Sequence, residues 1–252
     1  MRRVGGLLPS PVDPRDWPSE DLLGARRKLS TPQDASLRSY VDSVLDQGNT
    51  ESCVGNAVAQ AVRVLMRARG TSAAFLPSRL MVYYNSRAVH GGTTSDVGTY
   101  MRAALASIQK LGFCSEEVWP FDESKINKKP SWNAYRKGIH NRVVNGYYAI
   151  KQKGDARVER VKTAILDKRP IVFGMRIDRA FEQATGSNVI GVPTGDIIGG
   201  HAMCIIGYDA EGVDVVNSWG TSWGDQGYGK LSWDVVAWEK AIDFYVVTMV
   251  KS

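Results

Sequence analysis

Cysteine and histidine are both scarce in this chain of 252 residues, which has three of each. An odd number of cysteines this low does not make a disulfide framework, and three unpaired thiols fit a reducing compartment. No C-x-x-C or H-x₃-H spacing is present, so we expect no structural zinc site, and nothing in the sequence calls for another metal or a cofactor. One reactive thiol among structural ones is compatible with this count.

Long hydrophobic runs are also missing. No stretch of about 18 apolar residues occurs, which excludes a membrane-spanning helix and a membrane partner. The apolar start of the chain stops at Pro9, short of the roughly 7–15 residues that a secretory signal needs. We therefore expect a cytoplasmic protein by default, with export by another route left open. The length suits one medium domain or two half-domains that share a cleft.

Charge is unevenly distributed along the chain, whose formal net charge is +6. Residues 125–169 hold thirteen Lys and Arg but only three Asp and Glu. This stretch is either a solvated basic face or a surface for an anion or nucleotide that binds weakly. No glycine-rich phosphate loop accompanies it, which favours the solvated face.

Helical patterns precede strand patterns in this sequence. Residues 1–35 carry five of the ten prolines and predict an extended arm. Apolar residues at a spacing of three to four predict a buried helix over 53–69, and further helices are expected at 77–89 and 96–110. The second half predicts strands at 143–150, 170–177, 202–208, 213–216, 227–231 and 244–250, with one helix at 156–167. This order indicates an α+β protein with two packed lobes.

Cys53 stands at the start of the predicted helix 53–69. The positive end of the helix dipole favours a thiolate there, and the backbone N–H of Cys53 has no partner within the helix and can bind an oxyanion. Gln47, six residues upstream, offers a second donor from its carboxamide, and Gly48 allows a tight turn beneath it. A cysteine alone is more often a small buried hydrophobe, so the interpretation depends on finding a base.

His201 opens the predicted strand 202–208 after two glycines, and neither His90 nor His140 has a comparable context. Asn217 follows the strand 213–216, and its carbonyl oxygen can accept a hydrogen bond from an imidazole and so fix the tautomer that takes a thiol proton. Trp219 would cover that hydrogen bond and exclude water from it.

Two blocks of the sequence resemble the papain family of cysteine peptidases. Gln47-Gly48-x₃-Ser52-Cys53 is similar to the family's nucleophile segment, and Asn217-Ser218-Trp219-Gly220-x₂-Trp223-Gly224-x₂-Gly227-Tyr228 is similar to its second half. The resemblance covers about residues 36–250. It implies a peptidase domain over 36–252, with a mainly helical lobe over about 36–142 and a β-barrel-like antiparallel lobe over about 143–252. The cleft between them would hold Cys53 as nucleophile, His201 as base, Asn217 as its orienter and Gln47 as an oxyanion donor.

The resemblance further implies a cysteine endopeptidase that acts on peptides or proteins through a thioester acyl-enzyme, since no inserted loop with a histidine blocks one end of the cleft. Gly98 would pair with substrate backbone, and further residues would contribute to substrate binding: Thr99, Tyr100, Met101, Gly174, Gly200, Ala202 and Trp219. The chain departs from the family signature where Glu51 and Val54 replace a glycine and an aromatic residue around the cysteine. The family's lobe disulfides and its long helical propeptide are missing.

Three points stay open at this stage. The arm 1–35 is either an intramolecular inhibitor that lies along the cleft or a leader docked elsewhere on the surface. A thiol acyltransferase would carry the same triad, with an amine in place of water as acceptor. A peptide-binding module without catalysis is the third reading, although it gives no reason to keep all four residues Gln47, Cys53, His201 and Asn217.

Overall fold

The computed structural model describes residues 4–14, 16–23, 32–71 and 74–249. Residues 1–3, on which the absence of a secretory signal partly depends, lie outside the described residues, as do residues 24–31 of the predicted arm. Within the described ranges, none of the helices has both the length and the apolar character needed to cross a bilayer.

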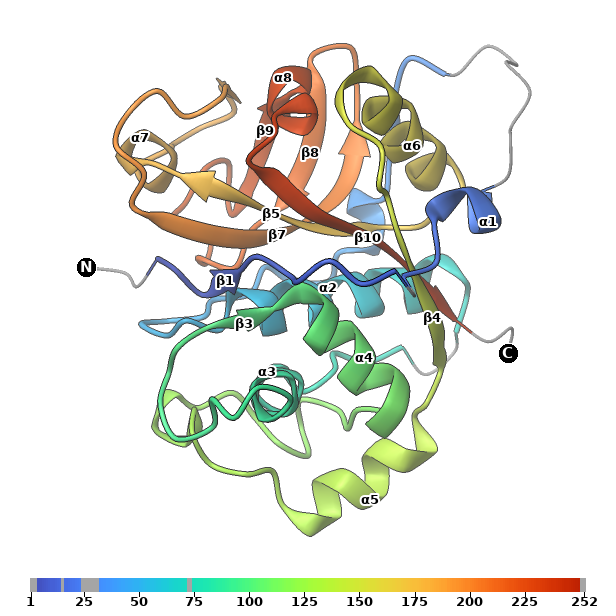
Figure 1. Cartoon of the computed structure of the whole chain (residues 1–252), viewed down its shortest axis with the longest axis vertical. Coiled ribbons are helices and arrows are strands. Elements are labelled where there is room, and N and C mark those ends of the chain that lie inside the picture. Colours follow the sequence, from blue (N-terminus) through green and yellow to red (C-terminus); the bar gives the residue numbers. More distant parts are fainter. Residues whose placement is uncertain (1–3, 15, 24–31, 72–73, 250–252) are drawn as a thin grey trace.

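The first half of the chain builds a helical lobe around α2 (Cys53–Ala68). Helix α3 (Arg79–Ala88) starts where the Ser78 hydroxyl accepts a hydrogen bond from the backbone N–H of Met81, which is a standard N-cap. Helices α4 (Met101–Leu111) and α5 (Trp132–His140) complete the lobe, and α3 and α4 pack on α2. Figure 1 shows this lobe below the sheet, with α5 at its outer end.

The second half builds one eight-stranded sheet in the order β4-β10-β5-β7-β8-β9-β6, with β2 paired to β7 beside this path. All neighbouring strands are antiparallel except β6 and β9. The path begins at β4 and ends at β6 without closing, so the expectation of a barrel-like lobe is corrected to an open, mainly antiparallel sheet. The strands are β2 (Ala35–Ser36), β4 (Val144–Ala149), β5 (Ile171–Ile177), β6 (Val189–Ile190), β7 (Gly199–Tyr208), β8 (Gly212–Val216), β9 (Tyr228–Ser232) and β10 (Ala241–Met249).

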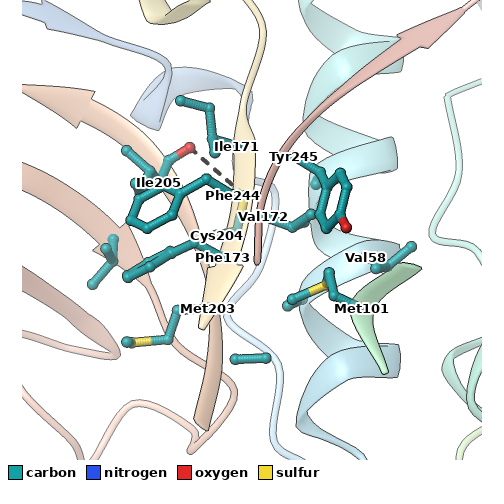
Figure 2. Packing of buried hydrophobic residues seen from close by; sticks show 14 of the residues in the cluster. Val58, Met101, Ile171, Val172, Phe173, Met203, Cys204, Ile205, Phe244 and Tyr245 are labelled. Carbon is teal, nitrogen blue, oxygen red and sulfur yellow. Dashed lines mark hydrogen bonds between the residues drawn. The ribbon is translucent and has the colours of Figure 1, made fainter. Parts of the chain in front are cut away.

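The hydrophobic core lies between α2 and the inner strands of the sheet. Strand β7 is buried along almost its whole length, and α2 contacts β7, β5 and β10. Figure 2 shows Val58 of α2 and Met101 of α4 on one side of β10, and Phe173, Cys204 and Phe244 on the other. Burying this two-sided apolar surface drives the two halves of the chain together, which brings the start of α2 next to the start of β7.

Short elements cover the remaining faces of the sheet. Helix α6 (Gly154–Leu166) packs against α8 (Trp233–Ala237) and β7, and α7 (Arg179–Glu182) begins at the N-cap Asp178. Two 3₁₀ turns, η1 (Arg38–Tyr40) and η2 (Glu123–Lys125), lie in the connections.

The main helices and strands occur where the sequence predicts them, with one informative difference. The helix predicted from Asp96 begins instead at Met101, because Gly98 adopts φ +74° and residues Thr99–Tyr100 form a short strand, β3. Helix α5 was not predicted. Residues 96–100 of the expected helix are thus non-helical, and β3 among them offers a strand edge with which another segment can pair.

The basic residues of 125–169 do not share one surface. They are spread over η2, α5, α6 and the connecting segments, and Figure 1 places α5 and α6 at opposite ends of the molecule. Arg157 is buried, and its guanidinium donates to the carbonyl oxygens of Val236, Trp238 and Ala241. The binding of an anion to this stretch stays a prediction. The basic surface available for it is smaller than the number of Lys and Arg residues indicates.

Candidate active site

Cys53 is the first residue of α2 and is fully buried. The pKa of its thiol is raised to about 12, chiefly by burial; hydrogen bonding from the backbone of Ala202 opposes this rise, and the negative charge of Glu51 adds to it. In this covered state, desolvation outweighs the helix dipole, which by itself favours a thiolate. The involvement of Ala202 places the thiol against the start of β7, one residue beyond His201.

His201 and Asn217 meet as the sequence predicts. The Nε2 atom of His201 lies 2.7 Å from Oδ1 of Asn217, and both side chains are buried. Trp219, fully buried, covers this pair, with its ring centroid 4.2 Å from that of the imidazole. Phe181 packs edge-on against Trp219, so the hydrogen bond lies in an apolar, water-excluding environment.

Gln47 is held in a fixed orientation beside the nucleophile turn. Its Nε2 donates to the carbonyl oxygen of Thr50 at 2.7 Å, and its Oε1 accepts a hydrogen bond from the Ser218 hydroxyl at 2.7 Å. The backbone N–H of Gln47 also donates to the carbonyl oxygen of Ser218. These bonds join the nucleophile loop to the Asn217 loop and define which way the carboxamide donors point.

The N-terminal arm runs between the two lobes, directly across this site. Strand β1 (Leu7–Leu8) pairs in parallel with β3, with Leu7 opposite Thr99, and the Thr99 N–H donates to the Gly6 carbonyl oxygen at 2.9 Å. Figure 1 shows this segment lying between β7 above and β3 below. The edge of β3, which is available because α4 begins only at Met101, is therefore occupied by the N-terminal segment of the same chain.

The fit of the arm is closest at Gly6 and Leu7. A Cβ atom on Gly6 would lie only 2.9 Å from the Sγ atom of Cys53, so the arm backbone covers the thiol. Leu7 is 4% exposed, and its side chain lies so close to Gly174 that a Cβ there would collide with it. The Leu7 carbonyl oxygen lies 2.8 Å from where a Cβ on Gly200 would stand.

Part of the predicted substrate wall lies against the arm. Gly174, Gly200 and Thr99 all lie directly beside Leu7. In this covered state the Gly98 N–H donates to the Tyr83 hydroxyl oxygen at 3.0 Å and Thr99 makes the backbone pairing with the arm, so the substrate-pairing role of Gly98 stays a prediction. Tyr100, Met101 and Ala202 lie in the same region, and their pocket role stays a prediction.

A polar latch, which the sequence did not reveal, fixes the arm beyond the cleft. Arg102 at the start of α4 pairs through Nε with Oδ1 of Asp16 at 3.0 Å and through Nη1 with Asp13 at 3.9 Å. Its Nη2 donates to the carbonyl oxygen of Pro11, and its backbone N–H donates to the Ser10 hydroxyl at 3.3 Å. Charged residues 86 positions apart along the chain (102 and 16) carry no local pattern from which this contact could be predicted.

The arm is anchored again where it leaves the latch. The Ser10 N–H donates to Oδ2 of Asp243 at 3.0 Å, and the Ala149 N–H donates to the Trp17 carbonyl oxygen at 2.8 Å. The Trp17 ring lies 5.5 Å from that of Tyr148, and α1 (Ser19–Leu23) packs against α6 and β4. Among the residues that the structure describes, no group of three or more His, Cys, Asp and Glu is placed to hold a metal ion.

Comparison with known proteins gives the family. A sequence profile described as papain family cysteine protease matches residues 31–243. The chain is 33% identical over 216 residues to an uncharacterized peptidase C1-like protein of Acanthamoeba polyphaga mimivirus, which covers 81% of this chain and 69% of the relative. Peptidase 1 of Euroglyphus maynei is 27% identical over 222 residues, with 85% of this chain and 65% of the relative covered. The chain belongs to the papain family of cysteine proteases, and it is a cysteine-type peptidase, a hydrolase.

Solved structures agree with this assignment. Xylellain, a cysteine protease from Xylella fastidiosa, superposes with a TM-score of 0.83 at 26% identity and covers 99% of both chains. Bromelain from Ananas comosus, in complex with the E64 inhibitor, gives a TM-score of 0.70 at 22% identity over 87% of this chain and 100% of its own. Procathepsin L 3 of Tenebrio molitor gives 0.70 at 18% identity over 88% of this chain and 71% of its own. The last two show the fold alone.

Proposed function

We propose that this chain is a cysteine endopeptidase with Cys53 as nucleophile, His201 as general base and acid, Asn217 as the orienter of the imidazole and Gln47 as an oxyanion donor. The observation that supports the proposal is the convergence of the start of α2, the His201–Asn217 pair and the Gln47 carboxamide, which are joined by the contact of the Ala202 backbone with Cys53 and by the Ser218–Gln47 hydrogen bond. The catalytic domain of the proposal is 36–252, with 1–35 as an N-terminal extension.

The reaction follows from these groups. The Cys53 proton passes to Nδ1 of His201, since Nε2 is engaged by Asn217, and the thiolate attacks the substrate carbonyl carbon. The Cys53 N–H and Gln47 Nε2 stabilise the oxyanion. The C–N bond then breaks as His201 gives its proton to the leaving amine, and a thioester remains. Water, deprotonated by His201, hydrolyses the thioester and releases the carboxylic acid and the thiol.

The arm is the intramolecular inhibitor in this proposal. It covers the Cys53 Sγ atom with Gly6, fills the pocket at Gly174 with Leu7, and occupies the β3 edge on which a peptide would pair. A substrate must displace these contacts before it reaches the thiol. The low reactivity of a thiol whose pKa is raised to about 12 by burial adds to the restraint.

Hydrolysis of an unstructured fluorogenic peptide by the full chain tests the catalytic proposal. Cys53→Ala should remove nearly all turnover, and Gln47→Ala should lower kcat by about 10²–10³, as is typical for one oxyanion donor. No difference between Cys53→Ala and the unaltered chain would refute the proposal. Adding an amine acceptor distinguishes the acyltransferase, which would form the amide product in place of the free acid.

A further inference from the structure

The loop that carries Gln47, residues 46–52, is not fixed by a disulfide, since all three cysteines of the chain are free. Ser218 holds the Gln47 side chain through Oε1. Among the described residues, Nε2 of Gln47 has one acceptor, the carbonyl oxygen of Thr50, so its second hydrogen is the one that can reach an oxyanion. The direction of that hydrogen therefore depends on how the loop holds Thr50 and Gln47 relative to each other.

A buried series of hydrogen bonds holds this loop from the inside. The Thr50 hydroxyl donates to the Gln47 carbonyl oxygen at 2.7 Å and lies 2.7 Å from the Ser52 hydroxyl. Because Thr50 has one hydroxyl hydrogen and gives it to Gln47, Ser52 is the donor between the two hydroxyls. The Ser52 hydroxyl oxygen in turn accepts from Nδ2 of Asn56 at 3.0 Å. All four residues are at most 3% exposed, and we call Asn56, Ser52 and Thr50 the polar chain.

Arg79, the first residue of α3, stands at the far end of the polar chain. Its Nη1 donates to Oδ1 of Asn56 at 3.0 Å and to the carbonyl oxygen of Asp46 at 2.8 Å. An arginine can only donate, so it fixes the oxygen end of the Asn56 amide and thereby directs Nδ2 toward Ser52. The guanidinium reaches Gln47 by two routes, one through the polar chain and one through the backbone of the preceding residue, Asp46.

Arg79 is itself held in one orientation. Its Nε and Nη2 lie 2.9 and 2.8 Å from Oε1 of Glu116, and its backbone N–H donates to Oε2 of Glu116 at 3.0 Å. The Phe121 N–H donates to the same carboxylate, and the centre of the Phe121 ring lies 4.2 Å from Cζ of Arg79. All three nitrogens of the guanidinium are therefore engaged. A lysine has one nitrogen in their place and cannot hold Glu116 and both oxygens of the loop side at once.

We infer that Arg79 is a positioning residue for oxyanion stabilisation, which holds the loop 46–52 so that Nε2 of Gln47 points to where the substrate oxygen becomes negative. The inference rests on the proposed peptidase function and extends it. Arg79 does not contact the substrate, and it acts through the polar chain and Asp46. A donor stabilises an oxyanion only when it is preorganised, and a displacement of about 1 Å can cost on the order of 10²-fold in rate. Because this interaction is made in the transition state, its loss lowers kcat and leaves KM unchanged.

The test measures kcat and KM for an unstructured fluorogenic peptide, with every variant made in the full chain with Leu7→Ala so that the arm restrains the enzyme less. Arg79→Lys keeps a positive charge beside Glu116, and kcat should fall about 10–100-fold at unchanged KM. Thr50→Val removes the hydroxyl from the polar chain and should give a similar loss, whereas Thr50→Ser keeps the hydroxyl and should retain most of the rate. Arg157, a buried arginine that donates to three backbone carbonyl oxygens away from this loop, gives the control, and Arg157→Lys should leave kcat unchanged.

Two further measurements distinguish positioning from a general loss of structure. In a chain with Gln47→Ala no side-chain donor remains to be positioned, so Arg79→Lys should lower kcat no further. Alkylation of Cys53 by iodoacetamide passes through no oxyanion, so its rate should not change in Arg79→Lys. Additive losses in the double variant, or alkylation slowed as much as hydrolysis, would mean that Arg79 acts on the fold or on the thiol, and would overturn the inference.

The outcomes also separate the two proposals. If the chain with Leu7→Ala alone does not hydrolyse the peptide, the proposed function fails and the inference fails with it. If hydrolysis proceeds and kcat is the same in Arg79→Lys, the positioning role is refuted while the peptidase stands. Should Arg79→Lys fail to fold, as judged by its unfolding midpoint, Thr50→Val and Thr50→Ser decide the question, and equal kcat in these two variants would contradict the inference.

Discussion

Replacing Leu7 by alanine weakens the arm at its most buried contact and keeps the backbone pairing with β3. Leu7 is 4% exposed, and its side chain fills the pocket at Gly174. Full burial of a leucine side chain stabilises by about 1.5–3 kcal/mol. Most of that is lost in Leu7→Ala, because alanine retains only the Cβ atom. The equilibrium between covered and open cleft should shift toward the open state by roughly 10–100-fold, since 1.4 kcal/mol is about one factor of ten.

The assay has two readouts and a matched control. Turnover of an unstructured peptide should rise by up to this factor, and the Thr99 amide, which donates to the Gly6 carbonyl oxygen, should exchange its hydrogen faster. Val12→Ala trims a side chain of the same arm that is 98% exposed and should change neither. Faster exchange at Thr99 with unchanged turnover would show that the arm covers the cleft without restraining the enzyme, and would refute the reasoning.

Further predictions concern Arg102 and its contacts with the arm, the partly buried carboxylate of Asp243, and the Cys53 thiol. Arg102→Met breaks the pairing with the arm and should raise turnover about 5–30-fold, for a loss of about 1–2 kcal/mol. Arg67→Met breaks a surface ion pair between α2 and Asp42 and should leave turnover unchanged. Burial raises the pKa of Asp243 above 3.8, so this group lowers stability as pH rises from near 3.8 through its raised pKa. Asp243→Asn keeps the oxygen that accepts the hydrogen bond from the Ser10 N–H, and asparagine tolerates φ +57°. The melting temperature of this variant should exceed that of the unaltered chain at pH 7 and match it at pH 3. A lower melting temperature at pH 7 would contradict the prediction. The rate at which a small alkylating reagent modifies Cys53 should rise only at alkaline pH in the unaltered chain. The apparent pKa of the Cys53 thiol, taken from that rate, should fall below about 12 when Leu7→Ala loosens the arm. Identical dependence of the rate on pH in the two proteins would argue against burial as the cause of the raised pKa.

The positions of the candidate site residues in the fold could be predicted from the sequence because their signals are local. Cys53 begins an apolar periodic run, and His201 and Asn217 each adjoin a strand with turn residues beside it. The antiparallel pairing of β7 with β8, in which Cys204 lies opposite Val216, then brings His201 near the start of β7 close to Asn217 after the end of β8.

The docking of the N-terminal arm could not be predicted because it depends on tertiary contacts. Whether Leu7 reaches Gly174, or Asp16 reaches Arg102, is decided by the shape of a cleft that forms only when both lobes have folded. The start of α4 was misplaced for the same reason: the sequence prediction began the helix at Asp96, whereas Gly98 has φ +74° and residues 99–100 pair with the arm as β3.

The most direct test of the central claim is the site of modification by a thiol-directed epoxide in the full chain with Leu7→Ala, mapped by mass spectrometry. All three cysteines are buried, so Cys114 and Cys204 serve as internal controls. The account predicts one adduct, on Cys53, which forms far more slowly when His201 is replaced by alanine. Modification of Cys114 or Cys204 at a comparable rate, or labelling of Cys53 that does not depend on His201, would contradict it.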